Sequence, residues 1–323
     1  MKRFLLTLCL LASLLLSSCS PATPAATDAY DDMIVVGFSQ VGAESDWRNA
    51  HTRSMMEALS AENGYRLIID DAQQKQERQI TAIRNFIHQG VDYIVLAPTT
   101  MAGWDTVLTE AKAAGVPVII VDRMIDSADE SLFTCWIGSD FRKEGDEAVA
   151  WMEKNLSTDA PRIVHLQGNT GTTAQQGRTE GLDAGLAKHP QWQLVYRNTA
   201  DFTQAKGQEL VEALLAQGIQ FDVIYSENDN MTYGAIDALK NAGLTPGKDV
   251  TIVSFDAAHK ALEMVMTGEI SYNVECNPLH GPRVKAVIEK LESGSKPPKF
   301  TFVEETSFDT ATITREVIDS RGY

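Results

Sequence analysis

The chain has 323 residues, 44% of them hydrophobic and 22% charged, which is typical of a globular protein large enough for two sizeable cores. Extensive disorder is not the default for such a composition. A formal net charge of −16 at pH 7 argues against binding of nucleic acid or anionic lipid head groups, because an acidic surface repels phosphate.

The first residues are typical of an export signal. A basic start ("MKR") precedes the apolar run Phe4–Leu16, which is too short to span a bilayer comfortably. "LSSC", ending at Cys19, then resembles a bacterial lipoprotein signal, which implies cleavage before Cys19 and its acylation. The alternative is an ordinary secretory signal cleaved nearby. We therefore expect a lipoprotein signal peptide with its lipobox cysteine at 1–19 and a flexible Ala-, Pro-, Thr- and Asp-rich tether at 20–32.

Two cysteines, Cys135 and Cys276, fall in the part of the chain expected to fold. Both lie in apolar, strand-like runs, which favours free buried thiols. Export to an oxidising compartment would permit a disulfide between them, and their spacing does not decide the question.

From residue 33 onward, apolar runs alternate with helical patterns. The runs are rich in Val, Ile, Leu and Tyr rather than strictly alternating, as expected of parallel strands buried on both faces. Ten strands are predicted, at 33–39, 65–70, 91–98, 116–122, 132–139, 162–168, 192–198, 221–227, 250–256 and 270–276. Intervening segments such as 76–90 repeat apolar residues at helical spacing and end in Gly, which predicts a doubly wound α/β fold.

The chain also contains an internal repeat. Segment 76–98 is echoed by 204–229, and the end of the following unit, 113–123, is echoed by 241–256. Two similar half-chains predict two α/β lobes of like topology. A single sheet of ten strands is the less favoured alternative, because it would be near the practical limit of size.

Candidate ligand-binding residues follow from the rule that ligands of open α/β sheets bind at the carboxyl ends of the strands. Carboxylates accept hydrogen bonds from hydroxyl groups, guanidinium and amide groups donate them, and an indole covers the apolar face of a sugar ring, so this mixture suits a polyol. The polar residues in these places are Glu44, Ser45, Asp46, Trp47 and Arg48 in one loop, Asp122 and Arg123 after the fourth run, and Arg178, Asn228, Asp229 and Asp256 in the second half.

Each of these residues also has a purely structural interpretation. Asp46 could complement a helix dipole, and Trp47 could pack beneath its loop. Asp122 with Arg123 could form a structural ion pair. Asn228–Asp229 and Asp256 could cap the helices that follow them. The joint placement at strand ends, distributed over both half-chains, favours a ligand cleft between two lobes.

Several of these stretches resemble a known family. "VGFSQVGAESDWR", "VPVIIVDR", "YSENDNMTYGAIDALKNAGLTPGKD" and "VSFD" resemble the type I periplasmic sugar-binding proteins, the ribose-binding-like receptors of ABC importers. The Glu-Ser-x-Trp-Arg order of the Glu44–Arg48 loop resembles the galactofuranose-binding members most specifically. The resemblance covers residues 30–323.

The resemblance implies ligand contacts from the Glu44–Arg48 loop, Asp122, Arg123, Arg178, Asn228 and Asp256. One position departs from the ribose-binding pattern, which often has Gln two residues before the proline of the late strand; this chain has Cys276 there. Glu275 is the candidate replacement, and the departure argues against ribose as the ligand.

The family also implies a hinge of three chain crossings near residues 139, 276 and 304. The lobes would then comprise 33–139 plus 277–304 and 140–276 plus 305–323. The expected protein is a monomeric, non-catalytic receptor of a monosaccharide, galactofuranose or a related aldose, that delivers it to an ABC permease. It would need no cofactor and contact the membrane only through its lipid anchor, on the outer face of the cytoplasmic membrane or in the periplasm.

Other functions are less favoured. The chain has no G-x-G-x-x-G after its first strand, Walker loop, G-x-S-x-G or H-E-x-x-H motif, and its six histidines are scattered, so no metal site is predicted. A LacI-type repressor core would need an N-terminal helix-turn-helix, and this sequence has the predicted signal peptide there instead. A sugar sensor that presents its ligand to a membrane chemoreceptor or kinase remains the main alternative, and a glycoside hydrolase is a further one.

Overall fold

A computed structural model describes residues 32–323. The predicted signal segment with Cys19, and all of the predicted tether except its last residue, lie outside the described residues. Among the helices from residue 32 onward, none is long and apolar enough to cross a membrane.

Two six-stranded sheets form the framework. The first has the order β11-β5-β4-β3-β1-β2 and the second β12-β10-β9-β8-β6-β7, and every pairing is parallel except that of β12 with β10. The strands are β1 Ile34–Gln40, β2 Tyr65–Asp71, β3 Tyr93–Leu96, β4 Val118–Val121, β5 Cys135–Gly138, β6 Arg162–Gln167, β7 Gln193–Thr199, β8 Val223–Ser226, β9 Thr251–Asp256, β10 Tyr272–Glu275, β11 Phe300–Phe302 and β12 Ser307–Asp309.

All ten predicted strands are present, and the half-chain repeat produces two lobes of the same topology. The order β5-β4-β3-β1-β2 in the first sheet corresponds to β10-β9-β8-β6-β7 in the second. The prediction of two lobes rather than one ten-stranded sheet is therefore confirmed. The sequence analysis missed β11 and β12, which have three residues each and are too short to give a periodic signal.

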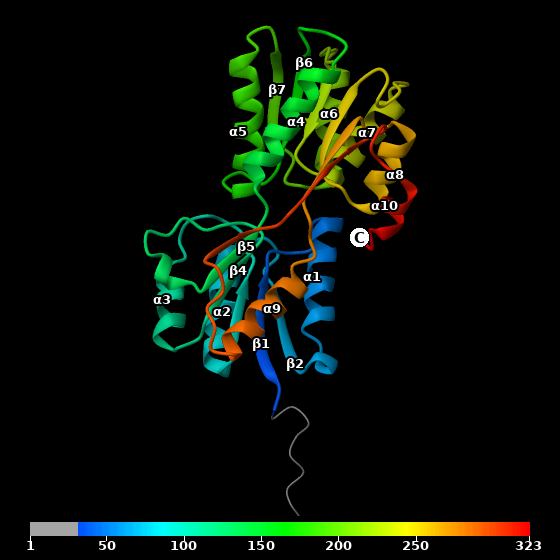
Figure 1. The fold of residues 1–323 in the computed structure, drawn as a ribbon. Helices are drawn as coiled ribbons and strands as arrows, with labels where there is room; N and C mark the ends of the chain where they lie inside the picture. Colours follow the sequence, from blue (N-terminus) through cyan, green and yellow to red (C-terminus); the bar gives the residue numbers. More distant parts are fainter. Residues whose placement is uncertain (1–31) are drawn as a thin grey trace, which may run out of the picture. The chain divides into compact units, whose positions relative to one another are not determined.

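The chain passes between the two sheets three times. It leaves the first sheet after β5, returns between β10 and β11, and crosses again between β11 and β12 (Figure 1). We call the sheet of β1–β5 and β11 with its helices the N-lobe, and the other sheet with its helices the C-lobe. The expected three-segment connection is confirmed by this topology.

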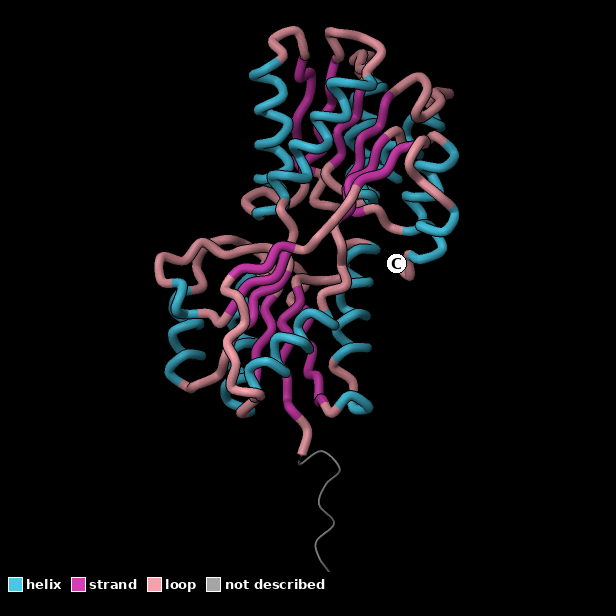
Figure 2. Tube along the Cα trace, viewed as in Figure 1, coloured by secondary structure: helices cyan, strands magenta, loops and turns pink. Residues whose placement is uncertain are grey.

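Helices cover both faces of each sheet (Figure 2). In β3, Tyr93 and Val95 pack into one hydrophobic cluster, whereas Ile94 and Leu96 pack into another on the opposite face. The alternation explains why these strands are apolar at every position. The helices are α1 Asp46–Ala58, α2 Gln76–Gln89, α3 Asp105–Ala113, α4 Phe141–Asn155, α5 Thr173–Lys188, α6 Gln204–Ala216, α7 Asp229–Asn241, α8 His259–Thr267, α9 Gly281–Glu292 and α10 Arg315–Ser320.

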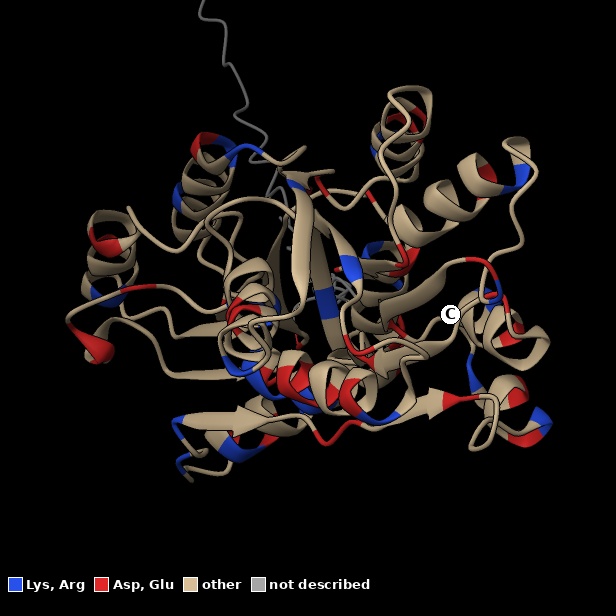
Figure 3. Ribbon diagram, turned by 90° about the horizontal axis from the view of Figure 1, so that it is seen from above, with Lys and Arg blue, Asp and Glu red and all other residues tan. Residues whose placement is uncertain are grey.

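Charged side chains are mixed along the solvent-facing helices. Exposed ion pairs at i,i+4 spacing include Arg142 with Asp146 at 2.9 Å and Lys143 with Glu147 at 3.6 Å. Figure 3 shows Lys and Arg positions interspersed with Asp and Glu positions in that view. Each exposed pair contributes a few tenths of a kcal/mol at most, so this pattern serves solubility more than stability.

Within the described residues, Cys135 and Cys276 are both buried free thiols. This confirms the favoured interpretation of the two cysteines.

Candidate functional site

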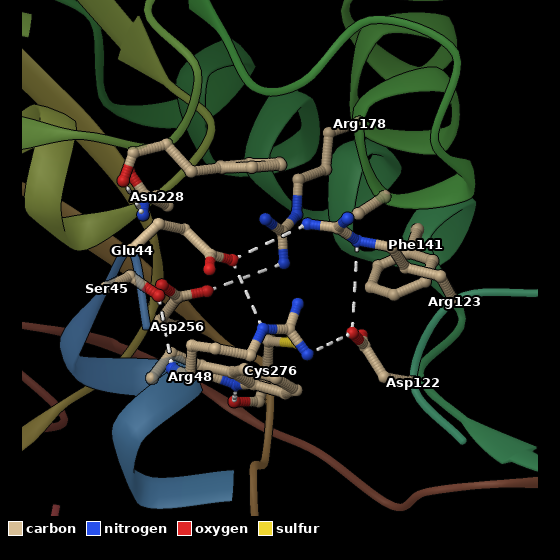
Figure 4. A pocket seen from close by; sticks show the side chains of 13 residues that line it. Glu44, Ser45, Arg48, Asp122, Arg123, Phe141, Arg178, Asn228, Asp256 and Cys276 are labelled. Carbon is tan, nitrogen blue, oxygen red and sulfur yellow. Dashed lines mark hydrogen bonds and ion pairs between the residues drawn. The ribbon is translucent and has the colours of Figure 1, made fainter. Parts of the chain in front are cut away.

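A cavity lies where the strand ends of the two lobes meet. Its lining combines charged, aromatic and small side chains from both lobes (Figure 4). The lining residues are Glu44, Ser45, Trp47, Arg48, Asp122, Arg123, Phe141, Ala174, Arg178, Phe202, Asn228, Asp256 and Cys276.

On the N-lobe side, Arg48 links two carboxylates. Its Nε donates to Glu44 Oε1 at 3.2 Å, and its Nη1 donates to Asp122 Oδ2 at 2.8 Å. The arginine is held in the first turn of α1, whose N-cap is Ser45; the Ser45 hydroxyl accepts from the Arg48 N–H at 3.1 Å. The same residues of the Glu44–Arg48 loop thus form the start of α1 and part of a cluster of charges.

Asp122 and Asp256 occupy equivalent places in the two lobes, directly after β4 and at the end of β9. Both have a positive φ, 64° for Asp122 and 110° for Asp256. Residues other than Gly rarely adopt this backbone conformation, and those that are held in it concentrate at functional sites. The strained turn at each strand end places the two carboxylates at the cavity.

On the C-lobe side, Arg178 extends from α5. Its Nε donates to Glu144 Oε2 at 2.7 Å, its Nη1 donates to the Glu227 carbonyl, and its Nη2 lies 3.7 Å from Asp256 Oδ1. Glu144 is in α4, which packs very closely on α5: a Cβ at Gly181 would lie 2.5 Å from the backbone of Gly145. This close helix contact brings the guanidinium and the Glu144 carboxylate together.

Three charged atoms at the cavity are buried without a hydrogen-bond partner among the described residues. They are Glu44 Oε2 and Arg123 Nη1 from the N-lobe and Arg178 Nη2 from the C-lobe. A buried charged group without a partner is destabilising by roughly 1–3 kcal/mol or more. One acceptor and two donors from the two lobes are therefore available to hydroxyl groups in the cavity.

The charges of the site shift one another's pKa values. Burial and the neighbouring Arg48 lower the pKa of Arg123 to about 10. Burial alone would raise the pKa of Asp122, but Arg48 and Arg123 outweigh it and hold that pKa below its ordinary value. Burial raises the pKa of Asp256 well above the ordinary value, which favours a neutral carboxyl that can donate a hydrogen bond.

Aromatic rings form the apolar part of the lining. The Arg123 guanidinium lies 5.5 Å from the ring centre of Phe202, and the Arg178 guanidinium lies 5.4 Å from that of Phe141. Trp47 is fixed across the lobes, since its Nε1 donates to the Cys276 carbonyl at 2.6 Å. Rings at these positions can contact the C–H face of a sugar while the arginines reach its edge.

The structure brings nine of the predicted ligand-binding residues together at the cavity. Asp46 and Glu275 do not line it. Asp46 lies at the rim, where its N–H donates to Asn230 Oδ1 of the C-lobe at 3.1 Å. Glu275 accepts from Asn277 Nδ2 at 3.0 Å and pairs with Arg321 instead. Side chains alternate along a strand, so it is Cys276, the next residue, that borders the cavity.

Some structural roles considered from the sequence are also present. Asn228 caps α7, because its Oδ1 accepts from the Met231 N–H at 2.9 Å, and it lines the cavity as well. Asp229 is buried behind the cavity, where its carboxylate accepts from Ser254 Oγ at 2.7 Å. Asp122 pairs mainly with Arg48 rather than with Arg123, whose Nε lies 3.9 Å away.

The sequence analysis missed four lining residues: Phe141, Ala174, Phe202 and Cys276. Phe141 follows β5 by three residues and Phe202 follows β7, so the strand-end rule covers both places. Trp47 is the one aromatic residue among the predicted ligand-binding residues, and the others are polar. Admitting aromatic residues to the same rule would have found the two phenylalanines.

Contacts between the lobes also close the rim of the cavity. Besides the contact of Asp46 with Asn230, the Met124 N–H donates to Thr173 Oγ1 at 3.1 Å, and Asn169 Nδ2 donates to Gln74 Oε1 at 2.9 Å. Each pair joins a strand-end loop or helix start of one lobe to that of the other. The arrangement is that of two lobes closed on one another.

Comparisons with known proteins agree with this geometry. Residues 36–311 match the periplasmic binding protein domain, and the chain belongs to that family. It is 37% identical to the galactofuranose-binding protein YtfQ of Escherichia coli over 296 residues, which covers 90% of this chain and 93% of the relative. The resemblance inferred from the Glu44–Arg48 loop and the later motifs is confirmed.

Two solved structures are similar along most of their length. One, from Mycobacterium smegmatis in complex with β-D-fucofuranose, has a TM-score of 0.83 and 41% identity and covers 87% of this chain and 92% of its own. The other is the periplasmic binding component of the arabinose ABC transporter of Shewanella sp. ANA-3 bound to α- and β-L-arabinofuranose, with a TM-score of 0.84, 40% identity, and 89% and 95% coverage. YtfQ and the Shewanella relative are binding proteins rather than enzymes, as expected from the sequence.

Asp122→Asn tests the charge cluster through its pH dependence. The arginines lower the folded-state pKa of Asp122, so its ionised form stabilises the fold above the unfolded-state pKa of about 4, and this contribution is lost as pH falls through the folded-state value. We expect the substitution to reduce the free energy of unfolding by about 3 kcal/mol at neutral pH and by much less near pH 3. Urea denaturation at both pH values measures the difference.

The exposed Asp126, four residues further on, provides the control. Asp126→Asn should change the unfolding free energy little at either pH. An equal loss in Asp122→Asn at both pH values would contradict the electrostatic account.

Proposed function

We propose that this protein is the extracytoplasmic solute-binding component of an ABC sugar importer and that it binds a monosaccharide in its furanose form. The observation that carries the proposal is the set of unpartnered charged atoms of Glu44, Arg123 and Arg178 around one cavity between two lobes. Hydroxyl groups both donate and accept, so a sugar satisfies all three.

The preference for a furanose rests on the relatives. One relative is complexed with β-D-fucofuranose, one is bound to α- and β-L-arabinofuranose, and YtfQ is a galactofuranose-binding protein. All three sugars share a five-membered ring with hydroxyl or hydroxyalkyl groups on its edge. The cavity of this chain suits such a ring, since apolar side chains, Phe141, Ala174 and Phe202 among them, line it together with the charged ones.

The mechanism follows from the distribution of contacts. Arg123 and Glu44 come from the N-lobe, whereas Arg178 and Asp256 come from the C-lobe, so a sugar contacts all of them only when the lobes are closed. Binding then shifts the population toward the closed form, which the permease recognises. We place the hinge at residues 139–140, 276–277 and 304–305, with lobes of 33–139 plus 277–304 and 140–276 plus 305–323.

Lipid anchoring is a further part of the proposal. Membership of the periplasmic binding protein family supports a location outside the cytoplasmic membrane. The "LSSC" motif at Cys19 supports attachment to its outer face through a lipid rather than a membrane-spanning helix.

A ligand screen tests the proposed function. A ligand that binds only the folded protein raises its free energy of unfolding, by about 2.7 kcal/mol when the free ligand concentration is a hundred times Kd, and so raises the melting temperature. We expect D-galactose, D-fucose and L-arabinose to give larger thermal shifts than D-ribose or D-glucose. With the C1 of the best sugar labelled with ¹³C, its bound NMR signal should be that of a furanose anomer. The absence of a shift with any monosaccharide would overturn the proposal, and a bound pyranose signal would overturn the ring assignment.

Arg178 provides the sharpest variant. Arg178→Ala removes charge-assisted hydrogen bonds worth roughly 1.5–3 kcal/mol, so calorimetry should show about ten- to one-hundred-and-fifty-fold weaker sugar binding. Arg178→Lys keeps the charge and tests binding if the alanine variant folds poorly; it should still bind more weakly, since an ammonium cannot reproduce the planar donor geometry. Lys188→Ala, on the exposed face of the same helix, should leave binding unchanged.

Cys19→Ala tests the anchor. In a bacterial host the protein without substitutions should incorporate labelled palmitate and sediment with membranes, and Cys19→Ala should do neither. Cys9→Ala, within the predicted signal, is the matched control and should behave like the protein without substitutions. Release of the latter without label would favour the ordinary secretory signal.

A further inference from the structure

A second cluster of reactive groups lies at the hinge, where Cys276 borders the ligand cavity and Glu144 and Glu305 lie outside its lining. One ligand atom from each of Glu144, Cys276 and Glu305 lies within 4.8 Å of the other two. The three residues come from separate segments: α4, the residue after β10, and the crossing between β11 and β12. Tertiary packing has therefore gathered two carboxylates and a thiol at one point.

The hydrogen bonds around this cluster leave ligand atoms available. Glu144 Oε2 accepts from Arg178, but Glu144 Oε1 is buried with no hydrogen-bond partner among the described residues, and the residue is only 3% exposed. Glu305 Oε1 accepts from Ser139 Oγ and from the Asn277 N–H, both at 2.6 Å. The Cys276 Sγ has Ser139 Oγ at 3.4 Å as its neighbour.

Little positive charge faces the cluster. Among the described residues, its side-chain hydrogen bonds reach one positive group, Arg178, and that guanidinium also lies near Asp256. Two crowded carboxylates beside a thiol are therefore poorly balanced.

An acidic cavity connects the cluster to solvent. Its lining includes a single basic residue, Lys143, and six carboxylates: Asp140, Glu144, Glu147, Glu275, Glu304 and Glu305. Such a surface attracts divalent cations and offers them a route to the buried ligands.

We propose that Glu144, Cys276 and Glu305 form a binding site for a thiophilic divalent cation, with Zn²⁺ as the best fit. Zinc accepts thiolate and carboxylate ligands together, whereas calcium and magnesium select oxygen ligands alone. Ligand atoms around a tetrahedral zinc are roughly 3.3–3.6 Å apart, so small side-chain rotations would let the three residues occupy three of its four positions, with water in the fourth. On binding, the Cys276 S–H loses its proton to solvent and the sulfur bonds to the metal.

The motif search by sequence could not find this site, because it contains no histidine and its members are 132 and 29 residues apart along the chain. The site lies at the hinge between the lobes, where the metal would connect α4 to two of the three crossing segments. The assignment does not depend on the proposed sugar, and its test uses protein without sugar.

The test uses tag-free protein beginning at Ser20, treated with a chelator that is then removed. Residues 33–323 form one compact unit of their own, so this chain retains the whole described body. Calorimetry with ZnCl₂ should show one bound ion per chain. Co²⁺ in place of zinc should give the strong near-ultraviolet absorption of a cobalt–thiolate bond.

Matched variants locate the ion. Cys276→Ala should abolish the cobalt–thiolate band, whereas Cys135→Ala, at the other buried thiol, should keep it. Glu305→Gln should weaken zinc binding at least tenfold, whereas Glu304→Gln, its neighbour at the mouth of the cavity, should weaken it by less than threefold. Circular dichroism checks that each variant is folded. If Glu305→Gln does not fold, the cobalt band in Cys276→Ala and Cys135→Ala decides the test.

Three results would overturn the proposal: no heat and no band in the unmodified protein, a band that persists in Cys276→Ala, or unchanged zinc affinity in folded Glu305→Gln. Because sugar is absent throughout, a failure of the sugar screen leaves this result unaffected, and the reverse also holds.

Discussion

The burial of charge between two lobes is the constraint on which the site depends. Three arginines and three carboxylates line the cavity with almost fully buried side chains, and charges can stay in such a place only when they face partners. Arg48 is satisfied within the N-lobe by Glu44 and Asp122. Arg123 and Arg178 each retain a nitrogen that has no hydrogen-bond partner among the described residues, and this makes the closed form receptive to a ligand rich in hydroxyl groups.

The same constraint connects the cavity to the hinge. Arg178 contacts Asp256 at the cavity and Glu144 behind it, and Glu144 lies beside Cys276 and Glu305 on the crossing segments. The groups that face the ligand and the groups that hold the lobes together therefore form one continuous network. Arg178 contacts both groups and Cys276 belongs to both, so a change of charge at the hinge reaches the ligand cavity directly.

Sequence reasoning predicted most of the fold because the relevant signals are local. A strand buried on both faces is apolar at every position, a helix shows its period within four turns, and a Gly marks its end. The repeat predicted two like lobes, and the strand-end rule predicted nine of the residues that line the cavity. The loop at Glu44–Arg48 carried the family resemblance by its residue order alone.

Tertiary structure decided what depends on contacts between distant segments. It placed β11 and β12 at the sheet edges, directed Asp46 to a rim contact with Asn230, and turned Glu275 toward Arg321 so that Cys276 borders the cavity. It also gathered Glu144, Cys276 and Glu305 at the hinge. The sequence by itself determined the elements, the repeat and the chemistry at the strand ends. Which side chains meet was decided by tertiary packing, because the partners, such as Arg48 with Asp122 and Asp46 with Asn230, are 74 and 184 residues apart along the chain.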